Sequence, residues 1–206
     1  MNERFFDLKK DKQDRIINGA MRIFAQNGYR HASTDEMVAA AGISKGLLFH
    51  YFKSKKGTWL FLYEYCTRYL LLELREADRR KGCNFFEMYR QLVRADAAVL
   101  KKYPWLPLFL KWADAEYARP GAIPVELPED LVRAAALHRD TLLKEAGRPP
   151  FLSEEDISSM EQMLEYTRFG LLQELLEQQE DSLRPLHEAY AEQLGAFLTT
   201  LRKMNI

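Results

Sequence analysis

Cysteine and histidine are scarce in this chain of 206 residues, and their scarcity excludes several kinds of site. The two cysteines, Cys66 and Cys83, are too few and too far apart for a disulfide framework or a zinc site. The four histidines are scattered, and neither a Glu-x-x-His pair nor a glycine-rich phosphate loop is present. We therefore expect no metal, no cofactor and no enzymatic activity.

Long apolar runs are also missing. The longest candidate, residues 59–74, is interrupted by Glu64, Arg68 and Glu73, so no segment reaches the roughly 20 apolar residues of a membrane span. The first residues, MNERFFDLKKDK, are charged and do not resemble a signal peptide. We expect a cytoplasmic protein that makes no contact with membranes.

Strand signals are absent as well, since the chain has no Asn-Gly hairpin and no sustained alternation of apolar and polar residues. Helical periodicity predicts an all-α fold of about nine helices. We expect a three-helix DNA-binding domain over residues 1–55 and a larger effector-binding and dimerisation domain over residues 56–206. The expected helices cover about 9–26, 34–41, 45–51, 55–81, 85–102, 105–117, 128–147, 154–178 and 183–203.

The stretch from Ser33 to Phe52 carries the strongest local signals. Ser33 is suited to cap a helix that begins at Thr34, and Gly42 is suited to end it, since glycine enters a left-handed conformation at low cost. Ser44 can then cap a second short helix. Two helices joined in this way form a helix-turn-helix, which inserts its second helix into the major groove of DNA.

The distribution of charge agrees with this interpretation. The formal net charge is zero, but residues 1–60 hold 11 Lys and Arg against 6 Asp and Glu, whereas residues 61–206 hold 19 against 24. The positive excess therefore accompanies the helix-turn-helix, where phosphates would have to be neutralised.

Residues around the motif match a known family. The chain reads IINGAMRIFAQNGY over residues 16–29, has Thr34, and reads AAGISKG over residues 40–46 and FKSK over residues 52–55. In this it resembles, over roughly residues 10–70, the DNA-binding domain of the tetracycline-repressor (TetR) family of bacterial regulators. The family usually carries Tyr-x-His-Phe at the end of the recognition helix, whereas FHYF stands here at residues 49–52. The resemblance implies a homodimer on a palindromic operator in double-stranded DNA, and an unidentified small-molecule effector.

The second helix of the motif presents the residues that would read DNA. Lys45 can donate to guanine O6 and N7, and Gly46 allows the backbone to approach the bases closely. Hydroxyl and imidazole groups that follow are suited to phosphate oxygens. The expected DNA-binding residues are Thr34, Ser44, Lys45, Gly46, Leu48, Phe49, His50, Tyr51 and Lys55.

The last two expected helices carry more apolar residues than a helix needs to pack on its own core. Two such helices from each of two chains can form a four-helix bundle, so we expect a homodimer. The alternative is that both helices only close their own core. The expected interface residues are Leu172, Leu176, Tyr190, Leu194 and Phe197.

Aromatic residues are concentrated between these two regions. Such stripes are usually core, but some of them can line an apolar effector cavity. The expected ligand-binding residues are Tyr89, Trp105, Phe109, Trp112, His138, Tyr166 and Phe169. We interpret the protein as a repressor that an apolar or amphipathic small molecule releases from DNA. The alternative is a dimeric helical DNA-binding protein that a protein partner controls, without a small-molecule effector.

Overall fold

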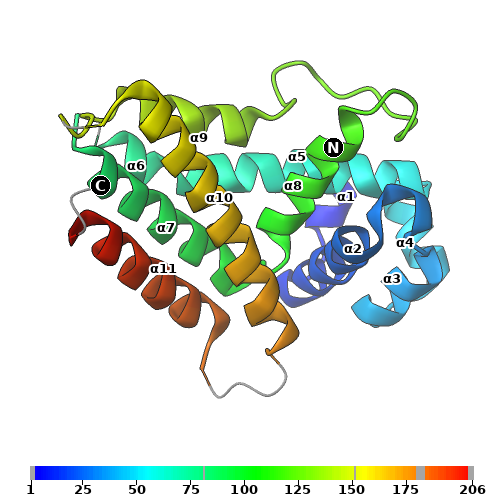
Figure 1. The fold of residues 1–206 in the computed structure, drawn as a ribbon. Helices are drawn as coiled ribbons and strands as arrows, with labels where there is room; N and C mark the ends of the chain where they lie inside the picture. Colours follow the sequence, from blue (N-terminus) through cyan, green and yellow to red (C-terminus); the bar gives the residue numbers. More distant parts are fainter. Residues whose placement is uncertain (1–2, 81, 151, 180–183, 204–206) are drawn as a thin grey trace. The chain divides into compact units, whose positions relative to one another are not determined.

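The computed structural model describes residues 3–80, 82–150, 152–179 and 184–203, and these residues form helices joined by turns and loops (Figure 1). The helices are α1 (Glu3–Phe6), α2 (Lys10–His31), α3 (Thr34–Ala41), α4 (Lys45–Phe52), α5 (Lys55–Glu73), α6 (Arg75–Asp78), α7 (Phe85–Lys102), α8 (Leu106–Tyr117), α9 (Ala134–Glu145), α10 (Glu154–Glu177) and α11 (Leu186–Lys203). Nine of these have eight or more residues, and the described residues contain no strand, so the expected all-α class is confirmed. None of the described helices is long and apolar enough to cross a membrane.

Side-chain caps begin several helices where the sequence predicts them. The hydroxyl of Ser33 accepts a hydrogen bond from the Asp35 amide at 3.2 Å, and that of Ser44 accepts one from the Leu47 amide at the same distance. Asn84 caps α7, and Ser153 forms a capping box at the start of α10. Each cap satisfies an amide that has no partner within its helix, so these starts are fixed by local chemistry.

The structure differs from the expectation at three helix ends. The helix expected over residues 9–26 continues across a kink at Gly28 to His31. The helix expected from residue 128 begins only at Ala134, because Arg133 has a φ of 53° and donates its amide to the Tyr63 hydroxyl at 3.0 Å. The helix expected over 55–81 ends at Glu73 and is followed by the separate turn α6. The expected ends at residues 81 and 183 lie outside the described residues.

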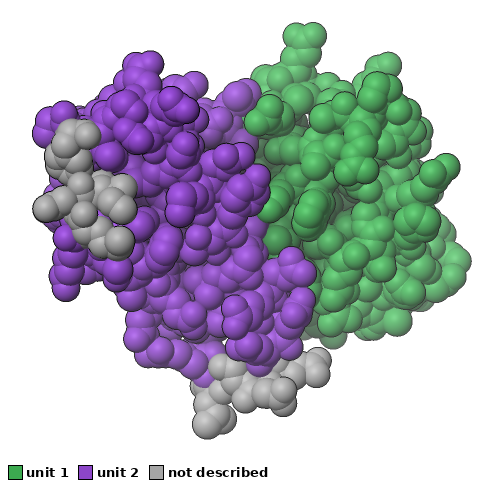
Figure 2. All heavy atoms as spheres, viewed as in Figure 1, with its two compact units in different colours: residues 1–69, 105–134 green, residues 70–104, 135–206 purple. Residues whose placement is uncertain are grey.

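The chain divides into two compact units, shown in different colours in Figure 2. Unit 1 comprises residues 1–69 and 105–134, and unit 2 comprises residues 70–104 and 135–206. The division falls inside α5, between Tyr69 and Leu70. Our expected boundary between a DNA-binding and an effector-binding domain, at residue 55, stays a prediction.

Unit 1 contains α1–α4, α8 and most of α5. Helix α2 packs against α3 and α8. The rings of Phe5, Phe52 and Phe61 meet at centroid distances of 4.8–5.3 Å and join α1, α4 and α5. Trp59 stacks on Tyr63 at 5.2 Å. Helix α4 therefore packs against an aromatic core that α1 and α5 share with it.

Unit 2 contains α6, α7, α10, α11 and all but the first residue of α9. Helix α11 packs along α7 and also against α10. The segment after α9 is fixed to the start of α7 by two backbone hydrogen bonds: Phe85 donates to the Gly147 carbonyl at 2.9 Å, and Gly147 donates to that of Cys83 at 2.8 Å. The helices therefore surround a common core.

Candidate DNA-binding site

The turn between α3 and α4 is built as the sequence predicts. Gly42 follows α3 in the left-handed conformation, with φ 62° and ψ 43°. The next amide, that of Ile43, returns to the Val38 carbonyl at 3.0 Å. These bonds satisfy groups at the end of α3 and allow Ser44 to start α4 immediately. Helices α3 and α4 therefore form a helix-turn-helix.

The leading edge of α4 is open to solvent. Ser44, Lys45, Gly46 and His50 are exposed. The Lys45 ammonium lies 2.9 Å from the carboxylate of Asp35 on α3, and both side chains are exposed. An exposed ion pair of this kind contributes little to stability, so the lysine can exchange its partner for a base edge at low cost.

The remaining expected DNA-binding residues are less accessible. Thr34, Phe49 and Tyr51 are half-buried, and the Tyr51 ring packs edge-on against Phe5. Leu48 is only 1% exposed and faces the core of unit 1, which corrects our assignment of this residue to the DNA surface. Leu48 lies one helical turn before the buried Phe52, so both side chains are on the inner face of α4.

Lys55 also differs from the expectation. Its ammonium donates to the carbonyls of Arg30 at 3.1 Å and Ala32 at 3.0 Å, and it lies 5.0 Å from the centre of the Tyr29 ring. A cation at the C-terminal end of a helix satisfies free carbonyls and complements the helix dipole. These contacts give Lys55 a structural role at the end of α2, and its expected contact with phosphate stays a prediction.

The end of α2 is also held by a side chain of α8, a contact that the sequence did not predict. Gly28 interrupts the helix with a φ of 66°, and the amide of Tyr29 then donates to the Glu116 carboxylate of α8 at 2.9 Å. A Cβ on Gly28 would lie 2.4 Å from this carboxylate. Because Glu116 is 87 residues away in sequence, no local pattern pointed to the contact.

Two glycines near the recognition helix have opposite surroundings, and this leads to a prediction. A Cβ on Gly57 would lie 1.9 Å from the Phe52 carbonyl oxygen, whereas one on Gly46 would meet nothing nearer than the Ser44 hydroxyl at 4.0 Å. We expect Gly57→Ala to lower the free energy of unfolding by about 2–3 kcal/mol, because backbone has to move. Gly46→Ala should leave stability unchanged or raise it by up to about 1 kcal/mol, as alanine favours helix.

Urea denaturation followed by circular dichroism measures both effects, and DNA binding separates them further. Gly46→Ala should bind DNA more weakly despite its intact fold, since the added methyl group lies on the exposed leading edge of α4. Equal stability of the Gly57→Ala and native proteins would show that the close turn between α4 and α5 relaxes without cost.

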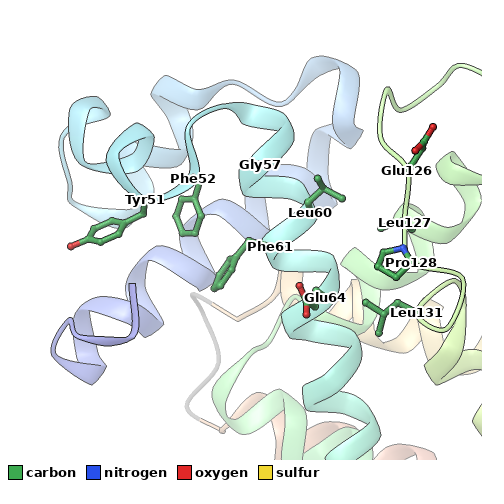
Figure 3. Close-up of a pocket in the computed structure, with 10 residues that line it drawn as sticks. All are labelled: Tyr51, Phe52, Gly57, Leu60, Phe61, Glu64, Glu126, Leu127, Pro128 and Leu131. Atoms are coloured by element: carbon green, nitrogen blue, oxygen red, sulfur yellow. The ribbon is translucent and has the colours of Figure 1, made fainter. Parts of the chain in front are cut away.

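A cavity of about 400 Å³ lies beside the end of the recognition helix (Figure 3). Its walls come from α4, from the first turns of α5 and from the segment that precedes α9. The lining residues are Tyr51, Phe52, Gly57, Leu60, Phe61, Glu64, Glu126, Leu127, Pro128 and Leu131. Of the residues expected to bind an effector, none lines this cavity.

The expected effector residues are divided between the two units. Trp105, Phe109 and Trp112 belong to unit 1, where Phe109 is buried against Phe24 and Trp59, and Trp112 is 41% exposed. Tyr89, His138, Tyr166 and Phe169 belong to unit 2. Within unit 2, Tyr89 is fully buried, Tyr166 is 67% exposed, and His138 contacts Asp78 at 3.1 Å. The seven residues thus form no single cluster within either unit.

The residues expected at a dimer interface lie mostly inside unit 2. Leu172, Leu176, Tyr190 and Leu194 are buried within the single chain, and Phe197 is half-buried. This corrects our residue assignment: the apolar stripes of α10 and α11 pack against their own core. The outward face of α10 instead carries Met163, Tyr166 and Gly170.

Unit 2 also contains a buried ionic group, here called the Asp96 cluster, that consists of Asp96, Arg139, Arg168 and Tyr190. Helices α7, α9, α10 and α11 each contribute one of these residues. The Asp96 carboxylate accepts from Arg168 at 2.7 Å, from Arg139 at 2.9 Å and from the Tyr190 hydroxyl at 2.9 Å. Burial by itself would raise the pKa of Asp96, but the charges of Arg139 and Arg168 outweigh this and hold the pKa below its usual value.

The geometry of unit 1 defines a helix-turn-helix module with an exposed, basic recognition helix. Residues 16–57 match the family described as bacterial regulatory proteins of the tetR family. The N-terminal part of the chain is thus similar to the proteins of that family, over residues 16–57.

Two curated relatives match the same region. An uncharacterised HTH-type transcriptional regulator, YerO of Bacillus subtilis, is 38% identical over 55 residues, which are 27% of this chain and 19% of that protein. The HTH-type transcriptional repressor AcnR of Corynebacterium glutamicum is 36% identical over 56 residues, which are 27% of this chain and 30% of that protein. The matched region therefore spans less than a third of either relative.

The fold of the whole chain also has solved counterparts. The MbdR regulator from Azoarcus sp. CIB is similar with a TM-score of 0.61 and 19% identity, over 91% of this chain and 96% of that one. At this identity the similarity concerns the fold: a helix-turn-helix domain followed by a helical C-terminal part.

Proposed function

We propose that the protein is a dimeric, sequence-specific DNA-binding regulator of transcription that acts as a repressor. The observation that carries this proposal is the exposed leading edge of α4, with Ser44, Lys45, Gly46 and His50, in a region similar to the tetR family. The N-terminal residues of a recognition helix meet base edges in the major groove. The relatives that share this domain are transcriptional regulators by name, which favours regulation over catalysis.

Lys45 provides the direct test of sequence reading. Lys45→Ala should weaken binding to the preferred duplex by about 1–3 kcal/mol, or roughly 5- to 150-fold, because a contact to guanine is lost. Binding to a random duplex should change much less. A preferred sequence selected from a random pool, with fluorescence anisotropy on both duplexes, supplies the measurement.

The matched control is Lys101→Ala, which removes an exposed cation from unit 2. It should leave both affinities unchanged. If Lys45→Ala weakens the two duplexes equally, then Lys45 contacts phosphate and sequence is read elsewhere. If the native protein shows no preference for any duplex, the proposed function is wrong.

The proposed dimer uses the outward faces of α10 and α11. Gly170 and Gly195 lie within these helices, and a Cβ on either would have no atom within 4 Å. Glycine inside a helix costs about 1 kcal/mol relative to alanine, and no contact among the described residues explains this cost here. A partner helix that approaches closely would explain it, and Met163 and Tyr166 on the same face of α10 would supply apolar area.

Release by an effector is the finer part of the proposal. Helix α5 begins three residues after α4 ends and contains residues of both units. A ligand that shifts α5 as a rigid body would change the separation of the two recognition helices in a dimer, which has to be about 34–36 Å or a related repeat. Effector and DNA would then weaken each other's binding by the same factor.

A further inference from the structure

The connection between α2 and α3 determines where the helix-turn-helix begins. Only Ala32 and Ser33 separate the end of α2 from Thr34, the first residue of α3. Gly28 interrupts α2 with φ 66° and ψ 174°, so residues 29–31 form a separate short turn of helix. The Tyr29 amide is the first of this turn and, like other amides at the start of a helix, finds no carbonyl within its own turn. It requires an acceptor from another part of the chain.

Glu116 of α8 supplies this acceptor. Its two carboxylate oxygens lie 2.9 and 3.2 Å from the Tyr29 amide nitrogen. The side chain is half-buried and makes no other hydrogen bond or ion pair among the described residues. Because a Cβ on Gly28 would lie 2.4 Å from the same carboxylate, the glycine provides both the bend and the room for it. Glu116 therefore fixes the backbone where the connection begins, through a charge-assisted hydrogen bond.

This carboxylate is held by a rigid part of unit 1. Helix α8 packs against α2. Phe109, which precedes Glu116 by two helical turns, is 1% exposed, and its ring lies 6.2 Å from that of Phe24 and 6.4 Å from that of Trp59. Lys55 binds two carbonyls of the same connection. A contact supported in this way fixes position more closely than one on a free surface loop.

The position of the connection affects Lys45 through α3. The far end of α3 is fixed on α2, where a Cβ on Gly19 would lie 2.8 Å from the Ala41 amide nitrogen. The near end follows the connection that Glu116 holds. Asp35, in the first turn of α3, is the ion-pair partner of Lys45. A shift of the near end would tilt α3 as a rigid body about its far end and displace the partner of Lys45.

We propose that Glu116 is a positioning residue for DNA recognition, which holds the connection between α2 and α3 so that Lys45 reaches the base edges. This role rests on the proposed function. Hydrogen bonds to base edges require defined distances and angles, whereas the attraction between phosphates and a basic surface does not. Loss of the carboxylate should therefore reduce the preference for one sequence more than it reduces affinity for DNA in general.

Charge alone and positioning predict opposite results for Glu116→Ala. Removal of a negative charge from a DNA-binding unit would strengthen binding to every duplex. We expect instead that Glu116→Ala binds the preferred duplex about tenfold more weakly, as for the loss of one hydrogen bond to a charged group, and a random duplex almost unchanged. Glu116→Gln keeps the volume and one acceptor oxygen, and should lose only about threefold on the preferred duplex.

Two measurements on the full chain, at a temperature where each variant is folded, give the result. Fluorescence anisotropy yields the affinities for both duplexes. Amide hydrogen exchange followed by nuclear magnetic resonance should show that the Tyr29 amide exchanges about tenfold faster in Glu116→Ala than in the native protein. General destabilisation would instead speed the exchange of many amides and lower both affinities by the same factor.

Glu129→Ala is the matched control, since it removes an exposed carboxylate of unit 1 that has no hydrogen bond or ion pair among the described residues. It should keep the native ratio of the two affinities. The proposed role of Glu116 is wrong if Glu116→Ala also keeps this ratio, or if its Tyr29 amide exchanges as slowly as in the native protein. A native protein that prefers no duplex would refute the proposed function itself, which is a separate result.

Discussion

Asp96→Asn should lower the free energy of unfolding by about 3–5 kcal/mol. The change removes a fully buried negative charge, which leaves Arg139 without the ion pair that the structure describes for it and leaves Arg168 with only the half-exposed Glu165. The side chain keeps its volume, so the loss comes from electrostatics and not from a cavity. Urea denaturation followed by far-ultraviolet circular dichroism measures it.

Two variants control for the mechanism. Glu165→Gln removes a half-exposed partner of Arg168 and should cost less than about 1 kcal/mol. The triple variant Asp96→Leu, Arg139→Met and Arg168→Met removes the whole ionic group, and should recover most of the stability that Asp96→Asn loses. A triple variant as unstable as Asp96→Asn would show that shape, not charge pairing, makes the site sensitive.

Asp96 also determines in which direction the stability of the protein changes with pH. The pKa of Asp96 is lower in the folded protein than its usual value of 3.8. Such a group contributes its full stability above the usual pKa and loses it as the pH falls through the lower pKa of the folded state. The native protein should therefore lose stability below about pH 4 more steeply than Asp96→Asn, for which this carboxyl no longer titrates.

The double variant Met163→Glu and Tyr166→Glu should be a folded monomer that binds operator DNA at least about 100-fold more weakly than the native protein. Both side chains are largely exposed in the single chain, at 57% and 67%, so their replacement leaves the fold of unit 2 intact. In a dimer, the four added charges would be buried without partners. The affinity falls because, in a monomer, binding at one half-site no longer raises the effective concentration of a second recognition helix at the other.

Analytical ultracentrifugation and circular dichroism together give the result. Leu172→Glu is the contrasting variant: its side chain is 1% exposed within the chain, so it should lose helix content instead of yielding a folded monomer. A native protein that sediments as a monomer at micromolar concentration would refute the dimer, and a charged double variant that remains dimeric would place the interface elsewhere.

Local chemistry made much of the fold predictable. Ser33, Ser44, Asn84 and Ser153 each satisfy amides within three residues of themselves, so the starts of their helices are written in short segments of sequence. The end of α3 is likewise determined locally, because Gly42 adopts the left-handed backbone conformation that glycine favours. The helix-turn-helix followed from such signals, and so did the exposure of Lys45 and Gly46.

Partners that are distant in sequence were not predictable. Asp96 bonds to residues 43 and 72 positions away, and no local pattern of sequence identifies these partners. The amide of Tyr29 is similarly paired with Glu116. Periodicity identified the apolar stripe that contains Leu172 and Leu194, but it cannot distinguish a stripe that packs on its own core from one that packs on a second chain.

The division of the chain inside α5 restricts how such proteins can be recombined. Between Gly57 and Glu73 this helix contains no further glycine and no proline, so it offers no natural joint at which one sensing half could be exchanged for another. A chimera has to be spliced within continuous helix, where each inserted residue turns everything that follows by about 100°. New combinations of operator and signal would therefore arise most readily from crossovers that keep the length of α5 unchanged, and length variants of this helix would be rare among functional hybrids.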